Sequence, residues 1–343
     1  MIPYVASMLP YTRTAHKVFL PAFSTACPQS ATIITMDSER THNRIDLYVL
    51  LPIVSGACWG LAGIFVRVFT EAGLDNPTIV FTRTAVCTLL TLLYILIKDR
   101  KLEPGARTLL YIRLRDLPFV LAIAVFGSLI LMICYNIAVK TLSLSLAAIL
   151  LCTAPIFVLL ISAVVFHEKI TLKKVICMLV ALAGCAGLSG LFSGGLYWSG
   201  FGLLMGAAAA LCNAVFIIMS KAIAIRGYSS FTVTFWSSLF ASVILCFIID
   251  WHALISYLAA SPLSGTLLML TQSVITSLLP SLIYVVAMRH VEAGRVAILQ
   301  SGAEPTAAFL AGLLLYAETP TPAGLIGMAI TILALMVLAG DRS

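Results

Sequence analysis

The chain has 343 residues, of which 61% are hydrophobic and only 10% are charged, and its mean hydropathy is +1.07. An ordinary globular protein carries about 25% charged residues, because a surface in water needs them. This composition excludes a soluble protein and predicts a chain that faces lipid over most of its area. The net charge of +7 would suit a nucleic-acid-binding protein, but the placement of Lys and Arg along the chain follows membrane topology instead.

Residues 1–44 precede the first long apolar segment and are expected to form a disordered extension. They are rich in proline and hydroxyl residues and have no acidic residue before Asp37. Their apolar run VFLPAF is too short for a signal peptide and is interrupted by Pro21. An alternative start at Met36 would leave MDSERTHNRIDLY as a short charged lead into the first apolar segment.

Ten apolar segments follow this extension. A helix needs about 20 apolar residues to cross about 30 Å of hydrocarbon. The predicted spans are 47–69, 78–97, 117–139, 144–166, 175–192, 201–225, 231–249, 267–288, 296–316 and 323–339. The sequence therefore predicts an all-α integral membrane protein with ten transmembrane helices.

The basic residues give the predicted spans a direction. If the N-terminus is cytoplasmic, all 21 Lys and Arg residues fall in inner segments except Arg67 and Lys140 outside and Arg83 within the second span. Cytoplasmic loops carry an excess of Lys and Arg. We therefore expect a multi-pass protein of the plasma (inner) membrane with both termini in the cytoplasm.

The two halves of the chain look like copies of each other. Residues 145–171 read SLAAILLCTAPIFVLLISAVVFHEKIT, and residues 294–321 read GRVAILQSGAEPTAAFLAGLLLYAETPT. Pro155 matches Pro305, and Tyr135 matches Tyr284 in a register shifted by one residue. Each half has an odd number of spans, and the basic loop HEKITLKK has the counterpart AETPTPAG, which lacks Lys and Arg. We expect two inverted five-helix repeats, residues 45–192 and 198–340.

Away from the ends of the predicted spans, the interior contains one acid, Glu304, and one clear base, Arg83. A charge at the bilayer centre costs about 2.5–3.5 kcal/mol on insertion scales, so each needs a role or a partner. Glu304 could cap backbone groups freed by Pro305 or bond to a neighbouring helix, contact substrate, or carry a coupling proton. Arg83 could extend to the outer interface, or line a cavity and meet an anionic group or Glu304.

Uncharged side chains complete a candidate binding site between the repeats, where carriers built from inverted repeats bind their ligands. Trp59 and Asn213 occupy corresponding places in the first and sixth spans, and Gln300 lies one turn before Glu304. The candidate substrate-binding residues are Trp59, Arg83, Tyr135, Asn213, Tyr284, Gln300 and Glu304. Pro155, Pro280 and Pro305 are candidate hinges, although proline also produces static bends.

An ordered set of motifs resembles the EamA-type members of the drug/metabolite transporter superfamily. The motifs are ACWGLAGIFVRVF from Ala57, FTRTAVCTLLTLL from Phe81, the block 135–171, and YVVAMRHVEAGRVAILQSGAEPTAAFLAGLLLYAE from Tyr284. The resemblance covers roughly residues 47–340. It implies a secondary transporter that works by alternating access and often exports small metabolites, amino acids or toxic compounds. The implied partners are a small-molecule substrate, the lipid bilayer and a proton as candidate coupling ion. It implies neither a particular substrate nor an oligomeric state.

Other function classes fit the sequence less well. The chain has no P-loop for a primary pump, and two interior charges do not line a channel. No His or Asp lies in a predicted span, so an intramembrane lipid-modifying enzyme lacks its clustered groups. The nine cysteines have no CxxC spacing, so we expect no metal, cofactor or disulfide framework. A membrane binding or scaffold protein without flux is the remaining alternative.

Overall fold

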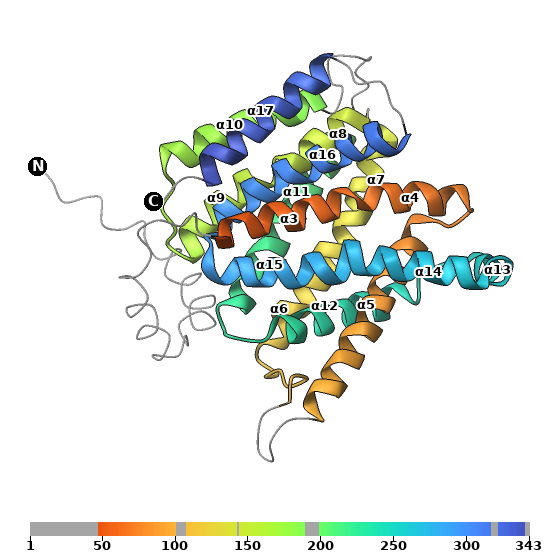
Figure 1. The fold of residues 1–343 in the computed structure, drawn as a ribbon. Coiled ribbons are helices and arrows are strands. Elements are labelled where there is room, and N and C mark those ends of the chain that lie inside the picture. Colours follow the sequence, from red (N-terminus) through yellow and green to blue (C-terminus); the bar gives the residue numbers. More distant parts are fainter. Residues whose placement is uncertain (1–46, 101–107, 143, 189–198, 317–321, 340–343) are drawn as a thin grey trace, which may run out of the picture. The chain divides into compact units, whose positions relative to one another are not determined.

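The computed structural model describes residues 47–100, 108–142, 144–188, 199–316 and 322–339, and every regular element within these ranges is a helix (Figure 1). Among the described residues, eight helical segments are long and apolar enough to cross a membrane, and Ser230–Leu245 is a shorter apolar helix. The predicted fold class is therefore confirmed: the protein is an all-α membrane protein built from two inverted five-helix repeats. The proposals about the N-terminal extension and the start at Met36 lie outside the described residues.

The first half of the chain contains five spans, three of which are interrupted. They are α3–α4 (Leu47–Gly60 and Ala62–Glu71), α5 (Asn76–Asp99), α6–η1–α7 (Leu117–Ala124, Val125–Ile130 and Leu131–Thr141), α8–α9 (Leu144–Cys152 and Ala154–Val165) and α10 (Leu172–Leu188).

The second half also contains five spans, and one of these is interrupted. They are α11 (Gly200–Ala224), α12 (Ser230–Leu245), α14–η2–α15 (Pro262–Ser273, Val274–Leu278 and Leu279–His290), α16 (Ala293–Tyr316) and α17 (Pro322–Ala339).

The short helix α13 (Trp251–Ala260) was not predicted from the sequence. The expected seventh span ran on to residue 249, but α12 ends at Leu245. Asp250 then starts a new helix, because its side chain accepts a hydrogen bond from the Ala253 amide at 3.1 Å. Asp250 therefore caps the N-terminus of α13. In the sequence it had only marked the end of the seventh predicted span.

The packing of the helices follows the repeat. α3 packs against α15 and α16, and its counterpart α11 packs against α6–α7 and α8–α9. The two second spans, α5 and α12, contact each other, and so do the two fifth spans, α10 and α17 (Figure 1). These contacts of one half therefore have matching contacts in the other.

A wide helical turn of the π type interrupts the third span and the eighth span, at Val125–Ile130 and Val274–Leu278. These two segments begin at matching places in the register that aligns Tyr135 with Tyr284. Such turns occur often at functional sites. The sequence analysis predicted neither, although Pro280 follows the second one closely.

Two glycines bring α3 and α16 into backbone contact. A Cβ atom at Gly56 would lie 2.9 Å from the carbonyl oxygen of Gln300, and one at Gly60 would overlap the carbonyl oxygen of Glu304. Small residues four positions apart allow such close approach of membrane helices. The first span therefore fixes the part of α16 that carries Gln300 and Glu304.

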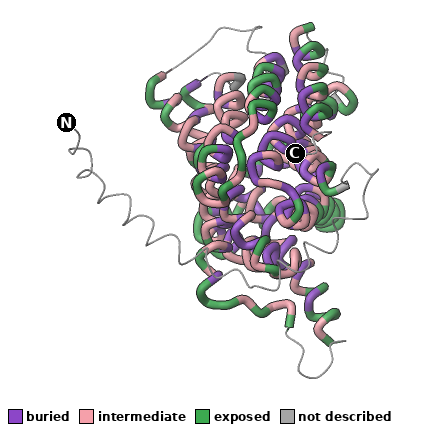
Figure 2. Tube along the Cα trace, turned by 90° about the vertical axis from the view of Figure 1, so that its left-hand side faces the viewer, coloured by how far each residue is buried: buried purple, intermediate pink, exposed green. Residues whose placement is uncertain are grey.

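We name the two ends of the helix bundle after residues that lie there. The Glu168 end is where α9 and α15 finish and α3 and α16 begin, and the Lys140 end is the opposite one. Figure 2 shows that buried residues lie mainly inside the bundle and exposed ones on its outer faces. Large apolar side chains such as Leu89, Val164 and Phe247 are exposed there, as expected for a surface that faces lipid.

The buried apolar side chains are distributed differently at the two ends. Toward the Glu168 end, one cluster joins both halves of the chain and includes Val120, Val158, Ile217, Met288 and Val296. At the Lys140 end the described residues form two separate clusters. One contains Phe65, Phe69, Ile79, Leu245 and Met269, and the other contains Ala138, Leu142 and Ala147. The bundle is therefore packed more continuously at the Glu168 end.

Candidate functional site

A cavity of about 250 Å³ lies between the two halves of the bundle. Its lining side chains come from the first four spans of each half. The fifth spans, α10 and α17, contribute none of the lining residues in the described part of the chain and pack against each other instead. Equivalent spans of the two repeats therefore line the cavity.

Five of the seven predicted substrate-binding residues line this cavity. Trp59, Arg83, Asn213, Gln300 and Glu304 come from α3, α5, α11 and α16. The structure brings these side chains together although they are far apart in sequence. Their role in binding stays a prediction.

The two predicted tyrosines do not line the cavity. Tyr284 is buried just behind it, with its ring centroid 5.1 Å from that of Trp59 and 5.7 Å from that of Phe216. It therefore supports the two aromatic side chains that do line the cavity. Tyr135 packs beside the cluster of Ala138, Leu142 and Ala147 at the Lys140 end.

Arg83 and Glu304 reach the cavity from different sides. α16 packs against α3, α9, α10 and α17, whereas α5 packs against α12 and α14. Both side chains line the same cavity. Within the described residues, however, no ion pair or hydrogen bond joins them. Both predicted interior charges therefore face the same space without neutralising each other by direct contact.

Two buried polar atoms at the cavity also lack protein partners. Gln300 and Thr234 are only 4% and 2% exposed, and neither the Gln300 Oε1 atom nor the Thr234 Oγ1 atom has a hydrogen-bond partner within the described part of the protein. Both residues line the cavity. A buried polar atom without a partner is unfavourable, so these atoms are suited to accept or share a hydrogen bond with an occupant.

The sequence analysis missed the hydroxyl-rich wall that α12 contributes. Thr234, Ser237 and Ser238 line the cavity together with Ala241 of the same helix. Their spacing places them on one face of a helix, since residues three, four and seven positions apart are neighbours there. This helical spacing of small and hydroxyl residues was the signal that could have revealed them.

The three predicted hinge prolines lie in different local structures. Pro155 is in the first turn of α9, after a turn at Thr153 that separates α8 from α9. Pro280 is in the first turn of α15, just after the π segment, and Pro305 is inside the unbroken helix α16. Hinge motion at these prolines stays a prediction.

Pro305 cannot donate a hydrogen bond to the carbonyl group four residues earlier, that of Ser301. In the structure this carbonyl oxygen accepts a weak hydrogen bond from the Cys185 thiol at 3.7 Å. The neighbouring α10 thus supplies the partner for the freed backbone group. The carboxylate of Glu304 lies at the cavity instead.

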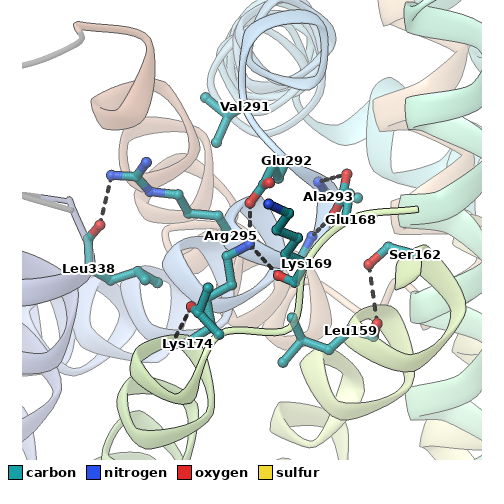
Figure 3. A network of polar contacts seen from close by, with 12 residues as sticks. Leu159, Ser162, Glu168, Lys169, Lys174, Val291, Glu292, Ala293, Arg295 and Leu338 are labelled. Carbon is teal, nitrogen blue, oxygen red and sulfur yellow. Dashed lines mark hydrogen bonds and ion pairs between the residues drawn. The ribbon is translucent and has the colours of Figure 1, made fainter. Parts of the chain in front are cut away.

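Polar contacts join the two halves at the Glu168 end (Figure 3). The carboxylate of Glu168 accepts hydrogen bonds from the backbone amides of Ala293 at 2.8 Å and Gly294 at 3.2 Å. It therefore caps α16, where a negative charge is favourable. Lys174 is buried, forms an ion pair with Glu292 and donates to the carbonyl oxygen of Lys169 at 2.9 Å.

A further lysine contact at this end links the sixth span to the loop after the eighth. The Lys221 Nζ atom donates a hydrogen bond to the carbonyl oxygen of Val291 at 2.6 Å. Its counterpart in the first repeat is Arg67, which lies at the Lys140 end. Arg67 contacts Glu71 at 3.5 Å, and its side chain is 50% exposed. The two matching cations thus have different surroundings at the two ends.

Asp116 ties the start of the third span to the connection between α11 and α12. It accepts hydrogen bonds from the Arg226 Nη1 atom and the Tyr228 hydroxyl, both at 2.6 Å. Arg226 also lies over the Phe119 ring, 3.8 Å from its centroid. Removal from water and the hydrogen bond to Asp116 raise the pKa of Tyr228.

We expect Tyr228→Phe to lower the free energy of unfolding by about 1.5–3 kcal/mol. It removes the hydrogen bond to the Asp116 carboxylate and the weaker one that the hydroxyl accepts from the Arg113 backbone amide at 3.3 Å. Since the pKa of Tyr228 is raised in the folded protein, the stabilisation is complete below the ordinary tyrosine value of about 10 and is lost as pH rises through the folded value. Thermal unfolding in detergent at pH 7 and at pH 11 measures both effects. A variant as stable as wild type at pH 7 would contradict this account of the contact.

The EamA-like transporter family matches the chain twice, over residues 46–190 and 200–340. The chain belongs to the EamA-like transporter family. The resemblance to the drug/metabolite transporter superfamily is therefore confirmed, and the protein is a multi-pass membrane protein with membrane-spanning helices.

Two further proteins are similar to this EamA-like protein. An uncharacterized transporter from Archaeoglobus fulgidus is 29% identical over 131 residues, which are 38% of this chain and 43% of that protein. The chain thus spans less than half of that relative. A protein of known crystal structure matches 84% of this chain and 95% of its own, with a TM-score of 0.64 and 19% identity. At this level of identity the match shows a shared fold.

Proposed function

We propose that this EamA-like protein is a secondary carrier that moves a small molecule across the plasma membrane by alternating access. The observation that carries the proposal is the position of the cavity, which is lined by the first four spans of both inverted repeats. Carriers built from inverted repeats bind their solute near the membrane midplane at the repeat interface, and one repeat then moves against the other.

The orientation follows from the charges at the two ends. Lys and Arg residues gather at the Glu168 end, among them Arg113, Lys169, Lys174, Arg226 and Arg289. At the Lys140 end the described basic residues are Arg67 and Lys140. The positive-inside rule therefore supports a cytoplasmic Glu168 end and cytoplasmic chain termini.

The packing supports a cavity that is closed toward the cytoplasm and accessible from outside. At the Glu168 end, one apolar cluster and the contacts of Glu168 and Lys174 connect both repeats, and Lys221 joins two spans of the second repeat. At the Lys140 end the two apolar clusters are separate, and only the one with Phe65 and Leu245 contains buried residues of both repeats; the Asp250 amide donates a hydrogen bond to the Thr78 hydroxyl across the repeats at 3.2 Å. Fewer contacts between helices would therefore have to break for a solute to enter the cavity from the outer side.

The inverted repeat suggests how the outer side closes. Lys221 corresponds to Arg67, and Val291 corresponds to Leu142 in the register of the tyrosine pair. Lys221 holds the carbonyl oxygen of Val291 in this structure. In the opposite state we expect Arg67 to reach the carbonyl oxygen of Leu142, while the contact of Lys221 breaks. The resemblance to exporters favours release of the solute to the outside.

The Glu304→Gln variant tests the proposed solute pathway. A strain that overexpresses the wild-type protein is first challenged with a panel of toxic small molecules, and resistance names a transported solute and its direction. Uptake or counterflow of this solute in proteoliposomes is then compared between variants. We expect Glu304→Gln to lower transport about a hundredfold or more, because a buried charge that contacts an occupant is removed.

The matched control is Glu71→Gln, the same change at a side chain that is 70% exposed. It should transport like wild type. A properly folded Glu304→Gln protein with wild-type transport at every pH would exclude both substrate contact and proton coupling at this residue. Solute binding by wild type without any flux would instead favour a membrane binding protein.

A further inference from the structure

The segment 108–116, TLLYIRLRD, forms an exposed basic and apolar surface at the Glu168 end of the bundle. We propose that this surface binds an anionic phospholipid, with Arg113 and Arg115 against its phosphate and Leu114 among its acyl chains. The site lies outside the cavity and does not depend on which solute the cavity takes. It rests on the proposed orientation only for the leaflet, which is the cytoplasmic one.

The backbone of this segment is fixed to the second spans of both repeats. The Leu109 amide donates hydrogen bonds at 3.1 and 3.2 Å to the carboxylate of Asp99, the last residue of α5. The Leu109 carbonyl oxygen accepts a hydrogen bond from the Thr232 hydroxyl at 2.6 Å. That of Leu110 accepts one from the Trp236 Nε1 atom at 3.0 Å, again on α12. The segment is therefore a formed surface of the protein.

The neighbouring elements place this segment at the membrane surface. Asp116 is bonded to Arg226, which follows the end of α11. The same end of α11 carries Lys221, whose contact with Val291 lies at the Glu168 end. Exposed apolar side chains of α5 continue to Ile97, close to its last residue. Since such a surface faces lipid, the polar segment that follows it lies at the level of the headgroups.

The side chains that the segment exposes suit a headgroup region. Tyr111, Arg113, Leu114 and Arg115 are all exposed, and Leu114 is 85% exposed. A leucine flanked by two arginines can enter the boundary of the acyl chains while the guanidinium groups stay with the phosphates. Arginine can bind a phosphate through two parallel hydrogen bonds, and tyrosine is enriched at membrane interfaces. The pattern therefore fits a lipid that combines a phosphate with acyl chains.

The charge of the surface favours an anionic lipid. Four exposed cations border it, and they are Lys98, Arg100, Arg113 and Arg115. Within the described residues none of these four forms an ion pair. The two acids beside them already have partners, because Asp99 bonds to the backbone of the segment and Asp116 pairs with Arg226. Each basic residue near an anionic membrane surface contributes about fivefold to binding.

A lipid at this site would also stabilise a wall of the cavity. Thr232 and Trp236, which hold the segment, lie one turn apart at the start of α12. The same part of α12 supplies Thr234, Ser237 and Ser238 to the cavity lining. A lipid that fixes the segment therefore also restrains this helix. We expect the lipid to slow hydrogen exchange in the amides of residues 108–116 and 229–238.

Matched lipids test the inference on the purified full-length protein in a neutral detergent. Phosphatidylglycerol and phosphatidylcholine with the same acyl chains are titrated, and binding is measured by thermal stabilisation. Soluble glycerol phosphate, which has the same anionic group without acyl chains, is titrated in parallel. For wild type we expect phosphatidylglycerol to bind about tenfold or more tightly than phosphatidylcholine. Glycerol phosphate should not stabilise the protein at the same concentrations.

Variants of the exposed side chains separate the two parts of the site. The double variant Arg113→Gln/Arg115→Gln should bind both lipids about equally, whereas Arg113→Lys/Arg115→Lys should keep most of the preference. Leu114→Gln should weaken both lipids, because it removes the apolar contact. The matched control is Lys169→Gln/Lys173→Gln, which removes two exposed positive charges from the same end of the bundle. This control should keep the wild-type preference.

Four results would overturn the inference. They are equal binding of the two lipids to wild type, a wild-type preference in Arg113→Gln/Arg115→Gln, the same loss of preference in Lys169→Gln/Lys173→Gln, and full stabilisation by glycerol phosphate. The third would indicate a general effect of cytoplasmic charge, and the fourth a site for a soluble anion. Hydrogen exchange unchanged by phosphatidylglycerol would refute the link to α12. None of these measurements requires transport, so a failure of the carrier function would be seen separately as an absence of flux.

Discussion

Replacing Gly60 by leucine is expected to separate α3 from α16 and to lower the stability of the protein by about 3 kcal/mol or more. Even a Cβ atom at this position would overlap the carbonyl oxygen of Glu304. The neighbour is backbone, so it cannot move aside as a flexible side chain could, and overpacking of this kind costs about 1–3 kcal/mol or more. Thermal unfolding of the purified protein in detergent measures the change.

The matched control is Gly63→Leu on the same span. Gly63 is exposed, and no atom lies within 4 Å of a Cβ atom built there. This variant should unfold at the wild-type temperature. If Gly60→Leu fails to fold, Gly60→Ala gives the graded test: it should be less stable than wild type and transport poorly. Wild-type stability and transport in Gly60→Leu would show that the close contact does not hold α16 in place.

Replacing Lys221 by methionine is expected to shift the carrier about ten- to a hundredfold toward a state open to the cytoplasm. The variant loses the hydrogen bond of 2.6 Å to the carbonyl oxygen of Val291. A hydrogen bond from a charged group contributes about 1.5–3 kcal/mol, and each 1.4 kcal/mol changes an equilibrium tenfold. The equivalent change at the other end, Arg67→Met, should favour the outward-open state instead.

Access to the cavity from each side can be read with a single thiol. Ser281 and Cys87 both line the cavity, so Ser281→Cys in a Cys87→Ser background provides one reporter there. A membrane-impermeant thiol reagent is applied to vesicles of either orientation. Lys221→Met should label faster from the cytoplasmic side and Arg67→Met more slowly. Unchanged labelling in Lys221→Met would mean that this contact does not hold the cytoplasmic side closed.

Much of the fold could be predicted because membrane insertion leaves strong signals in a sequence. Apolar segments long enough to cross the bilayer gave the ten spans, and Lys and Arg gave their direction. The interior charges Arg83 and Glu304 were found for the same reason, since an ionisable group in an apolar segment is costly and therefore conspicuous. The structure places both at the cavity.

The hydroxyl residues of the cavity left no such signal. A serine or threonine in a helix can bond to a backbone carbonyl of the preceding turn, as Ser242 does to Ser238 at 2.7 Å and Thr88 to Thr84 at 2.9 Å. Such a residue costs little in a membrane helix, so its presence does not show whether it faces a cavity or another helix. Thr234 was missed for this reason.

Local breaks in the helices were also beyond the sequence analysis. The first span is interrupted at Leu61, and the π segments begin at Val125 and Val274. None of these three sites contains proline, the strongest local signal for a helix break. Whether Tyr135 and Tyr284 face the cavity depends on how their helices are rotated about their axes. The pattern of apolar residues does not define this rotation, because the side of a membrane helix that faces lipid and the side that faces protein are both apolar.

The distances across the two ends of the bundle test alternating access most directly. Spin labels at Glu71 and Thr141 report on the Lys140 end, and labels at the matching positions Ile225 and His290 report on the Glu168 end; all four residues are exposed. Pulsed electron resonance compares the otherwise unchanged protein with Lys221→Met. The account predicts a longer Ile225–His290 distance together with a shorter Glu71–Thr141 distance in the variant. Two distances that change in the same direction, or neither changing, would contradict it.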